Sequence, residues 1–212
     1  MYADSRLSRL AEIARERCAG AEPGHDWLHV RRVTENARRV GEAAGANVSI
    51  VMAAALLHEL FNYPKNHPES HLSGEVCAAE AAAVLRAEGW PADEAEAVCY
   101  CIRVHSFSRG ILPETLEGKV LQDADRLDAI GAIGIARCFS TGAEMGRPFY
   151  HPEDPFCQGR APDDKAWTLD HFYRKLLRIP ETLHTDAARE LAGQRVQFLE
   201  QFLAQLQDEV GL

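Results

Sequence analysis

The chain has 212 residues, a net charge of −9 and 46% hydrophobic residues. That apolar content supports a folded core and excludes a disordered chain, while the acidic balance argues against binding a nucleic-acid polymer or an anionic membrane through charge. No apolar run approaches the roughly 20 residues that span a bilayer. The N-terminal stretch, interrupted by charges from Asp4 onward, lacks the layout of a signal peptide. We therefore expect a cytoplasmic protein.

Most of the chain has apolar residues at helical spacing. The pattern predicts helices over residues 5–19, 26–44, 51–60, 70–88, 91–104 and 114–139. Asp26 opens the second of these and Gly45 suits its end, while Ser49 is expected to cap the third. The third helix, VMAAALLHEL, is apolar on all faces and is therefore expected to lie at the centre of the fold.

The region after residue 140 differs in composition. Residues 141–165 are rich in Pro, Gly and Asp and predict a long irregular loop. Loops of that length are usually lids, binding loops or disordered segments, and the sequence does not distinguish these. Two helices, over residues 168–179 and 180–210, are expected to follow. With no clearly alternating strand and no glycine-rich phosphate loop, the chain is predicted to be an all-α bundle. We expect a single domain over residues 1–212, with a core of about 20–140, the loop at 141–165 and C-terminal helices over 166–212.

Four polar side chains stand out because each lies at the inner face of a predicted helix: His29, His58, Glu59 and Asp125. Two imidazoles and two carboxylates suit a divalent ion such as Mn²⁺, Fe²⁺, Ni²⁺, Co²⁺ or Mg²⁺. Four protein ligands on an octahedral ion would leave two positions open for water or phosphate oxygens. The sequence therefore predicts one divalent metal ion, with Mn²⁺ ranked first.

The segments that carry these residues resemble the HD-domain superfamily of metal-dependent phosphohydrolases. The motifs are D-x-x-H-x-x-R-V from Asp26, LLHE at 56–59, NYPKNHP at 62–68, HS at 105–106, QDADRLDAIGAIGIAR at 122–137 and HFYRKLL at 171–177. The resemblance covers roughly residues 20 to 210, implies an HD-type helical bundle and places the metal ligands on the four residues above. At position 59 this chain has Glu where the family has Asp.

Other residues in these motifs are candidates for catalysis or substrate binding. Catalytic candidates are Lys65, His105 and Asp128, and substrate-binding candidates are Arg32, Lys65, Asn66, His105 and Lys175. Lys65 and Lys175 could hold a phosphate, and His105 could bind a phosphate or protonate a leaving oxygen. The lysines, the arginine and the histidine could equally have no role in catalysis or binding. Lysines and arginines are commonly solvated surface residues, and a His at a helix end complements the helix dipole.

The resemblance implies hydrolysis of a small phosphorylated substrate, a nucleotide, and most specifically pyrophosphohydrolysis of a (deoxy)nucleoside triphosphate. The alternative is a weakly active or inactive regulator that binds a nucleotide or a metal, because Glu59 replaces the family's Asp. The sequence is compatible with a homodimer but does not determine the oligomeric state.

Overall fold

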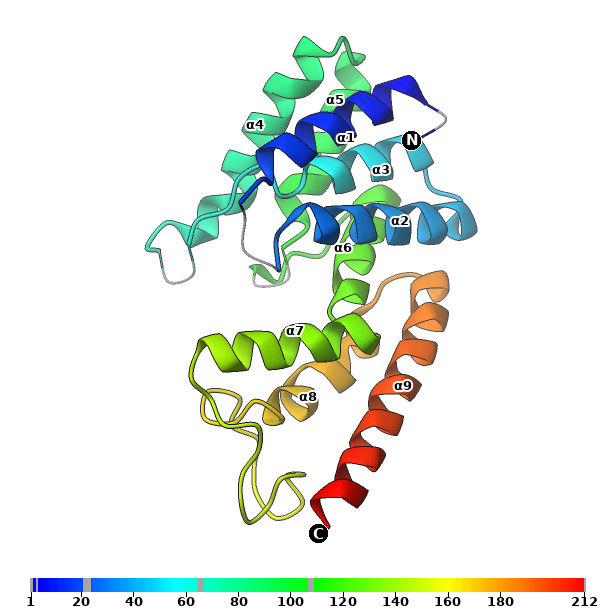
Figure 1. Ribbon diagram of the computed structural model, residues 1–212. Helices are drawn as coiled ribbons and strands as arrows, with labels where there is room; N and C mark the ends of the chain where they lie inside the picture. The colour runs from blue at the N-terminus through cyan, green and yellow to red at the C-terminus, as the bar shows by residue number, and fades with distance from the viewer. Residues whose placement is uncertain (1, 3, 21–23, 65–66, 107–108, 212) are drawn as a thin grey trace. The chain divides into compact units, whose positions relative to one another are not determined.

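The structure is a computed structural model that describes the chain except for residues 1, 3, 21–23, 65–66, 107–108 and 212 (Figure 1). The described residues form helices and loops and contain no β-strand, which confirms the all-α prediction. The chain divides into two compact units. Unit 1 comprises Met1–Asp125 with His184–Ala188, and unit 2 comprises Arg126–Leu183 with Arg189–Leu212. The single-domain organisation remains a prediction.

Unit 1 is built around one apolar helix. Its helices are α1 (Ser5–Arg17), α2 (Trp27–Ala44), α3 (Val48–Leu57), α4 (Ser73–Ala87), α5 (Ala92–Val104) and most of α6 (Leu116–Asp128). A short 3₁₀ turn, Ser70–Leu72, precedes α4. Helix α3 packs against α1, α2 and α5, and α5 packs against α4 (Figure 1). Every α3 residue from Val51 to Leu57 is buried, as expected for a helix that is apolar on all faces.

The helix ends confirm one predicted cap and correct another. Asp26 caps α2, where its carboxylate accepts a hydrogen bond from the backbone N–H of His29 at 2.9 Å, and Gly45 ends α2 with a φ of 76°. The prediction that Ser49 caps α3 was wrong. Helix α3 begins at Val48, and Asn47 is its cap, with its side-chain oxygen accepting from the N–H of Ile50 at 3.3 Å. Asn is as effective a cap as Ser, so the helix starts earlier.

The prediction of one long helix over residues 114–139 was also wrong. The structure has two helices there, α6 (Leu116–Asp128) and α7 (Gly131–Glu144). Ile130 between them is extended and buried, and Gly131 has a φ of 77°. A left-handed residue ends helical hydrogen bonding, and glycine adopts that conformation without steric cost. The apolar periodicity continues through the break, so it gave no warning of it.

Unit 2 contains α7, α8 (Asp170–Arg174), a 3₁₀ segment (Leu176–Thr182) and most of α9 (Asp186–Val210). The predicted bounds 168–179 and 180–210 were therefore wrong. Leu183 is extended after the 3₁₀ segment, and α9 starts only at Asp186. The core of this unit includes a fully buried Phe172 that stacks on Phe202 with ring centroids 5.8 Å apart.

Internal hydrogen bonds organise the loop between α7 and α8. Arg160 donates to both carboxylate oxygens of the buried Asp170, one of them at 2.7 Å from Nη2. Asp154 accepts from the backbone N–H groups of Gln158 and Gly159 at 2.9 and 2.8 Å. These bonds, rather than regular structure, fix the loop within unit 2.

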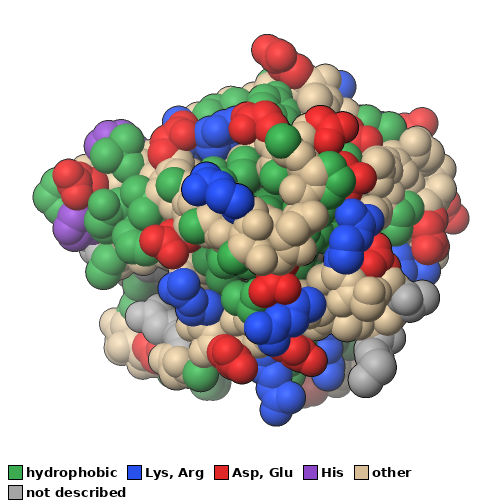
Figure 2. All heavy atoms as spheres, turned by 90° about the horizontal axis from the view of Figure 1, so that it is seen from above, with side chains coloured by type: hydrophobic (Ala, Val, Ile, Leu, Met, Phe, Trp, Pro, Cys, Tyr) green, Lys and Arg blue, Asp and Glu red, His purple; other side chains and the backbone are tan. Residues whose placement is uncertain are grey.

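Two further features concern the charged surface and the lengths of the helices. On the face drawn in Figure 2, basic and acidic side chains are interspersed, and the described residues gather into no broad basic patch there. Within the described residues, every helix is too short or too polar to cross a bilayer.

Candidate metal centre

Two buried histidines from neighbouring helices of unit 1 face each other. His29 lies in the first turn of α2, where Asp26 caps the helix, and His58 directly follows α3. Their Nε2 atoms are 3.3 Å apart. The Nδ1 of His58 donates to the carbonyl oxygen of Ala55 at 2.7 Å. Because Nδ1 carries the proton, neutral His58 has its lone pair on Nε2, the atom that faces His29.

Two carboxylates complete this cluster. Oε1 of Glu59 lies 3.7 Å from Nε2 of both His29 and His58, and Oδ1 of Asp125 lies 3.5 Å from Nε2 of His29. Ligand atoms about 2.0–2.2 Å from one octahedral ion lie roughly 3 Å apart when adjacent and about 4.4 Å apart when opposite. These four separations fall within that range, and the ligand atoms of His29, His58 and Asp125 all lie within 4.8 Å of one another. The four residues are therefore candidate ligands of one divalent ion. The structure thus brings together the four residues that the sequence singled out.

The electrostatic environment keeps two of these groups in the form that binds metals. Burial lowers the pKa of His58 to about 4, because the charged imidazolium loses its hydration. For Glu59, burial raises the pKa, but the hydrogen bond from His25 and the nearby imidazoles outweigh that effect and the pKa is about 2. At neutral pH, His58 is therefore neutral and Glu59 is ionised, as metal ligation requires.

His25 is a residue that sequence reasoning missed. Its Nδ1 lies 2.8 Å from Oε1 of Glu59, the same oxygen that faces His29 and His58. His25, His29 and Glu59 form a second set whose ligand atoms lie within 4.8 Å of one another. The available signal was the spacing of His25 and His29, one helical turn apart. The partner was not predictable, because it depends on how far the longer Glu side chain reaches.

A buried network next to Asp125 also escaped prediction. Asp123 is fully buried and accepts hydrogen bonds from the backbone N–H groups of His184 and Thr185, both at 2.9 Å. The hydroxyl of Thr185 donates to the same carboxylate at 2.8 Å, and Nε2 of His184 lies 2.8 Å from the amide oxygen of Gln122. This network ties α6, which carries Asp125, to residues far along the chain.

The candidate substrate residues of unit 1 have different environments. The ring of His105 lies 5.4 Å from that of His58, and its Nδ1 donates to the carbonyl oxygen of Ile102 at 2.6 Å. His105 is therefore adjacent to the metal cluster. Arg32 lies on α2 and lines a groove that α2 shares with α1. Lys65 and Asn66 lie outside the described residues.

Two further candidates belong to unit 2. Asp128 is buried, and its Oδ2 lies 2.9 Å from Nη1 of Arg137. Lys175 follows α8, where the chain turns into the 3₁₀ segment. The catalytic role of Asp128 and the substrate contact of Lys175 remain predictions.

Comparison with known proteins identifies the family. The model of the HD domain matches residues 27–130, a span that contains all four candidate ligands. The uncharacterized protein YpgQ of Bacillus subtilis (strain 168) is 39% identical over 191 residues, which cover 88% of this chain and 85% of YpgQ. The chain belongs to the HD-domain family. The matched span ends at Ile130, directly before the glycine that starts α7.

Two solved structures are similar to this chain over nearly its whole length. The crystal structure of Bacillus subtilis YpgQ in complex with ADP is 35% identical in the structural comparison. Its TM-score is 0.75, and the match covers 96% of this chain and 97% of that chain. An HD-superfamily hydrolase from Bacillus thuringiensis is 32% identical, with a TM-score of 0.74 and 96% of each chain covered.

Proposed function

We propose that this HD-domain protein is a metal-dependent phosphohydrolase that acts on nucleotides. The single observation that carries the proposal is the convergence of polar groups on His29, whose Nε2 lies 3.3 Å from His58, 3.7 Å from Glu59 and 3.5 Å from Asp125. A divalent ion bound there would polarise a phosphoryl oxygen and lower the pKa of a bound water.

The reaction proposed most specifically is pyrophosphohydrolysis of a (deoxy)nucleoside triphosphate. Water adds to the α-phosphorus, the bond between that phosphorus and the bridging α–β oxygen breaks, and pyrophosphate leaves. The products are a nucleoside monophosphate and pyrophosphate. The relative YpgQ was crystallised with ADP, which supports a nucleotide as the ligand of this protein too.

Other side chains are proposed to bind the phosphate oxygens and to neutralise their charge. His105 lies beside His58, and its Nδ1 donates a hydrogen bond to the carbonyl oxygen of Ile102. We propose that its Nε2 donates a hydrogen bond or a proton to a phosphate oxygen. Lys65 and Lys175 are the cations proposed to balance charge on the phosphate chain.

The test follows two products from one reaction. The metal-free protein is mixed with Mn²⁺ and a panel of dNTPs, with p-nitrophenyl phosphate as a simple monoester, and the release of pyrophosphate and of phosphate is measured. The proposal expects pyrophosphate from the dNTPs, dependence on Mn²⁺, and loss of turnover in Asp125→Ala. Release of phosphate alone would indicate a phosphatase. Turnover that survives both EDTA and Asp125→Ala would overturn the metal-dependent mechanism.

A second function is favoured by one contact. The carboxylate oxygen of Glu59 that faces the imidazoles is also hydrogen-bonded to His25 at 2.8 Å. If this bond holds Glu59 away from the ion, the protein is a nucleotide- or metal-binding regulator with little turnover. Binding without turnover, with turnover gained in Glu59→Asp, would support this second candidate.

A further inference from the structure

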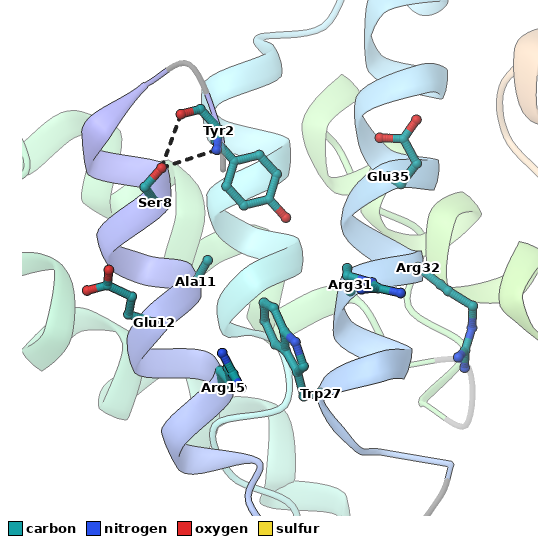
Figure 3. A pocket seen from close by; sticks show the side chains of 9 residues that line it. All are labelled: Tyr2, Ser8, Ala11, Glu12, Arg15, Trp27, Arg31, Arg32 and Glu35. Carbon is teal, nitrogen blue, oxygen red and sulfur yellow. Dashed lines mark hydrogen bonds between the residues drawn. The ribbon is translucent and has the colours of Figure 1, made fainter.

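A groove separates α1 from α2 in unit 1, and its volume of about 760 Å³ is that of a small-molecule pocket. Both helices pack on α3, and they contact each other only slightly. The walls come from one stripe of each helix, Ser8 to Arg15 on α1 and Trp27 to Glu35 on α2 (Figure 3). Pockets that bind cofactors and drug-sized ligands commonly have volumes of about 300–1,000 Å³.

The groove is distinct from the metal centre. Trp27 and Arg31 are four residues apart and share one face of α2, whereas His29 lies two residues from each. At about 100° per residue, His29 projects from roughly the opposite side of the helix. In agreement, His29 is buried, Trp27 is half-buried and Arg31 is exposed.

Two aromatic rings lie in the groove. The side chains of Tyr2 and Trp27 lie between the two helices (Figure 3). Tyr2 is fixed to α1, because its backbone N–H donates to Oγ of Ser8 at 3.2 Å and that hydroxyl donates to the Tyr2 carbonyl oxygen at 3.1 Å. Ala11 is the small residue in the middle of the α1 stripe and leaves room beside the rings. Such rings offer flat surfaces on which a planar base can stack.

Three arginines and two carboxylates line the groove, which leaves one positive charge in excess. Its two carboxylates are paired with arginines outside the lining: Glu12 with Arg9 at 3.0 Å, and Glu35 with Arg38 at 2.7 Å. Arg15 on α1 and Arg31 on α2 also line the groove, and within the described part of the chain no carboxylate forms an ion pair with either. In a chain with a net charge of −9, two such arginines on facing walls suit an anionic ligand.

We propose that this groove binds a nucleoside monophosphate at a site separate from the metal centre. The base stacks on Trp27 and Tyr2, and the phosphate binds Arg15 and Arg31. A planar ring and a phosphate in one molecule satisfy both features of the lining, which neither a simple anion nor an uncharged ring does. The proposal rests on the groove alone and does not require the hydrolase reaction.

The test is a calorimetric titration of the full chain with AMP in EDTA, so that no metal takes part. Adenosine and inorganic phosphate are titrated separately as the two halves of the ligand. We expect one AMP per chain, with each half bound at least about tenfold more weakly. Arg15→Ala and Arg31→Ala should each weaken AMP binding by about tenfold or more, since each removes a charge-assisted hydrogen bond.

Matched variants distinguish the groove from other sites. Arg86→Ala removes an exposed arginine of α4 outside the lining and should bind AMP as the unmodified chain does. Asp125→Ala should also bind AMP unchanged. The proposal is overturned if millimolar AMP does not bind, if Arg15→Ala and Arg31→Ala bind like Arg86→Ala, or if Asp125→Ala abolishes binding. Failure here leaves the Mn²⁺-dependent turnover assay unaffected, so the two proposals fail separately.

Discussion

Nε2 of His29 and Nε2 of His58 lie 3.3 Å apart, although the two residues are separated by 29 positions in the chain. Both side chains are buried, and both face the carboxylate of Glu59. Two imidazole nitrogens and a carboxylate so close together in an apolar interior are stabilised when a cation binds among them. This relationship underlies the predictions about metal binding.

Removing the carboxylate of Asp125, the more exposed of the two in this cluster, should abolish the stabilisation of the folded protein by a metal ion. Asp125→Ala is expected to lose the rise in melting temperature that Mn²⁺ gives the unmodified chain, because only the folded state binds the ion. Asp208→Ala, which removes an exposed carboxylate of α9, is the control and should keep that rise. Differential scanning fluorimetry with and without Mn²⁺ measures both. An unchanged rise in Asp125→Ala would remove Asp125 from the ligand set.

Shortening Glu59 should weaken the site. The Glu59 carboxylate reaches both imidazoles and His25, so Glu59→Asp withdraws it from all three by one methylene. We expect the Kd for Mn²⁺ to rise by about tenfold or more, with turnover falling in parallel. Titration calorimetry and the pyrophosphate assay measure the two effects. Higher turnover in Glu59→Asp would instead support the regulator.

His25 should act as a positioning residue for Glu59. His25→Ala removes the 2.8 Å partner of that carboxylate and is expected to weaken Mn²⁺ binding by about 10–100-fold, the usual effect of losing a group that orients a ligand. His25→Gln, which can still donate a hydrogen bond, should recover part of the affinity. A purely structural role predicts instead that both variants lose thermal stability and that neither changes the Kd of the remaining folded protein.

The sequence identified the four candidate ligands for a physical reason. His29, His58, Glu59 and Asp125 are polar groups that the apolar pattern predicts at the inner faces of helices, where an unpaired polar group is costly. It did not reveal the His25–Glu59 bond, the Asp123 network or the α1–α2 groove, because each depends on how helices pack. It also missed the break before Gly131, since periodicity reports which residues are buried and not where a backbone turns left-handed.

The break at Gly131 gives a stability prediction with a matched control. Gly131 has a φ of 77°, and an added Cβ would lie 3.2 Å from the Arg195 side chain. Gly131→Ala should therefore destabilise the protein by about 1–2 kcal/mol. Gly193 lies on α9 with open space around its Cβ position, and Gly193→Ala should stabilise by about 0.5–1 kcal/mol. Urea denaturation of both variants measures the difference, and equal effects would contradict the assigned backbone.

The buried pair of Arg160 and Asp170 should make unit 2 sensitive to acid. Burial raises the pKa of Asp170, but the hydrogen bonds from Arg160 and from the Asp163 N–H outweigh it, so the pKa lies below its ordinary value. Because the folded-state pKa is depressed, the contribution is complete above the unfolded value of about 3.9 and is lost as pH falls through the folded value.

Asp170→Asn tests that contribution directly. At pH 7 the variant should lose about 3 kcal/mol, because the Asp170 side chain is fully buried and Arg160 would lose its charged partner. The two proteins should converge in stability as pH falls through the depressed folded-state pKa of Asp170 and its carboxylate becomes protonated. Denaturant titrations at pH 7 and at progressively lower pH measure the difference, and a gap that does not depend on pH would rule out the ion pair as its cause.

Anomalous X-ray diffraction from crystals soaked in Mn²⁺, recorded on both sides of the manganese absorption edge, would locate the metal ion itself. We predict one anomalous peak, about 2.0–2.3 Å from Nε2 of His29 and of His58 and from carboxylate oxygens of Glu59 and Asp125. A fully soaked crystal with no peak there, or with its manganese bound by other residues, would contradict this prediction.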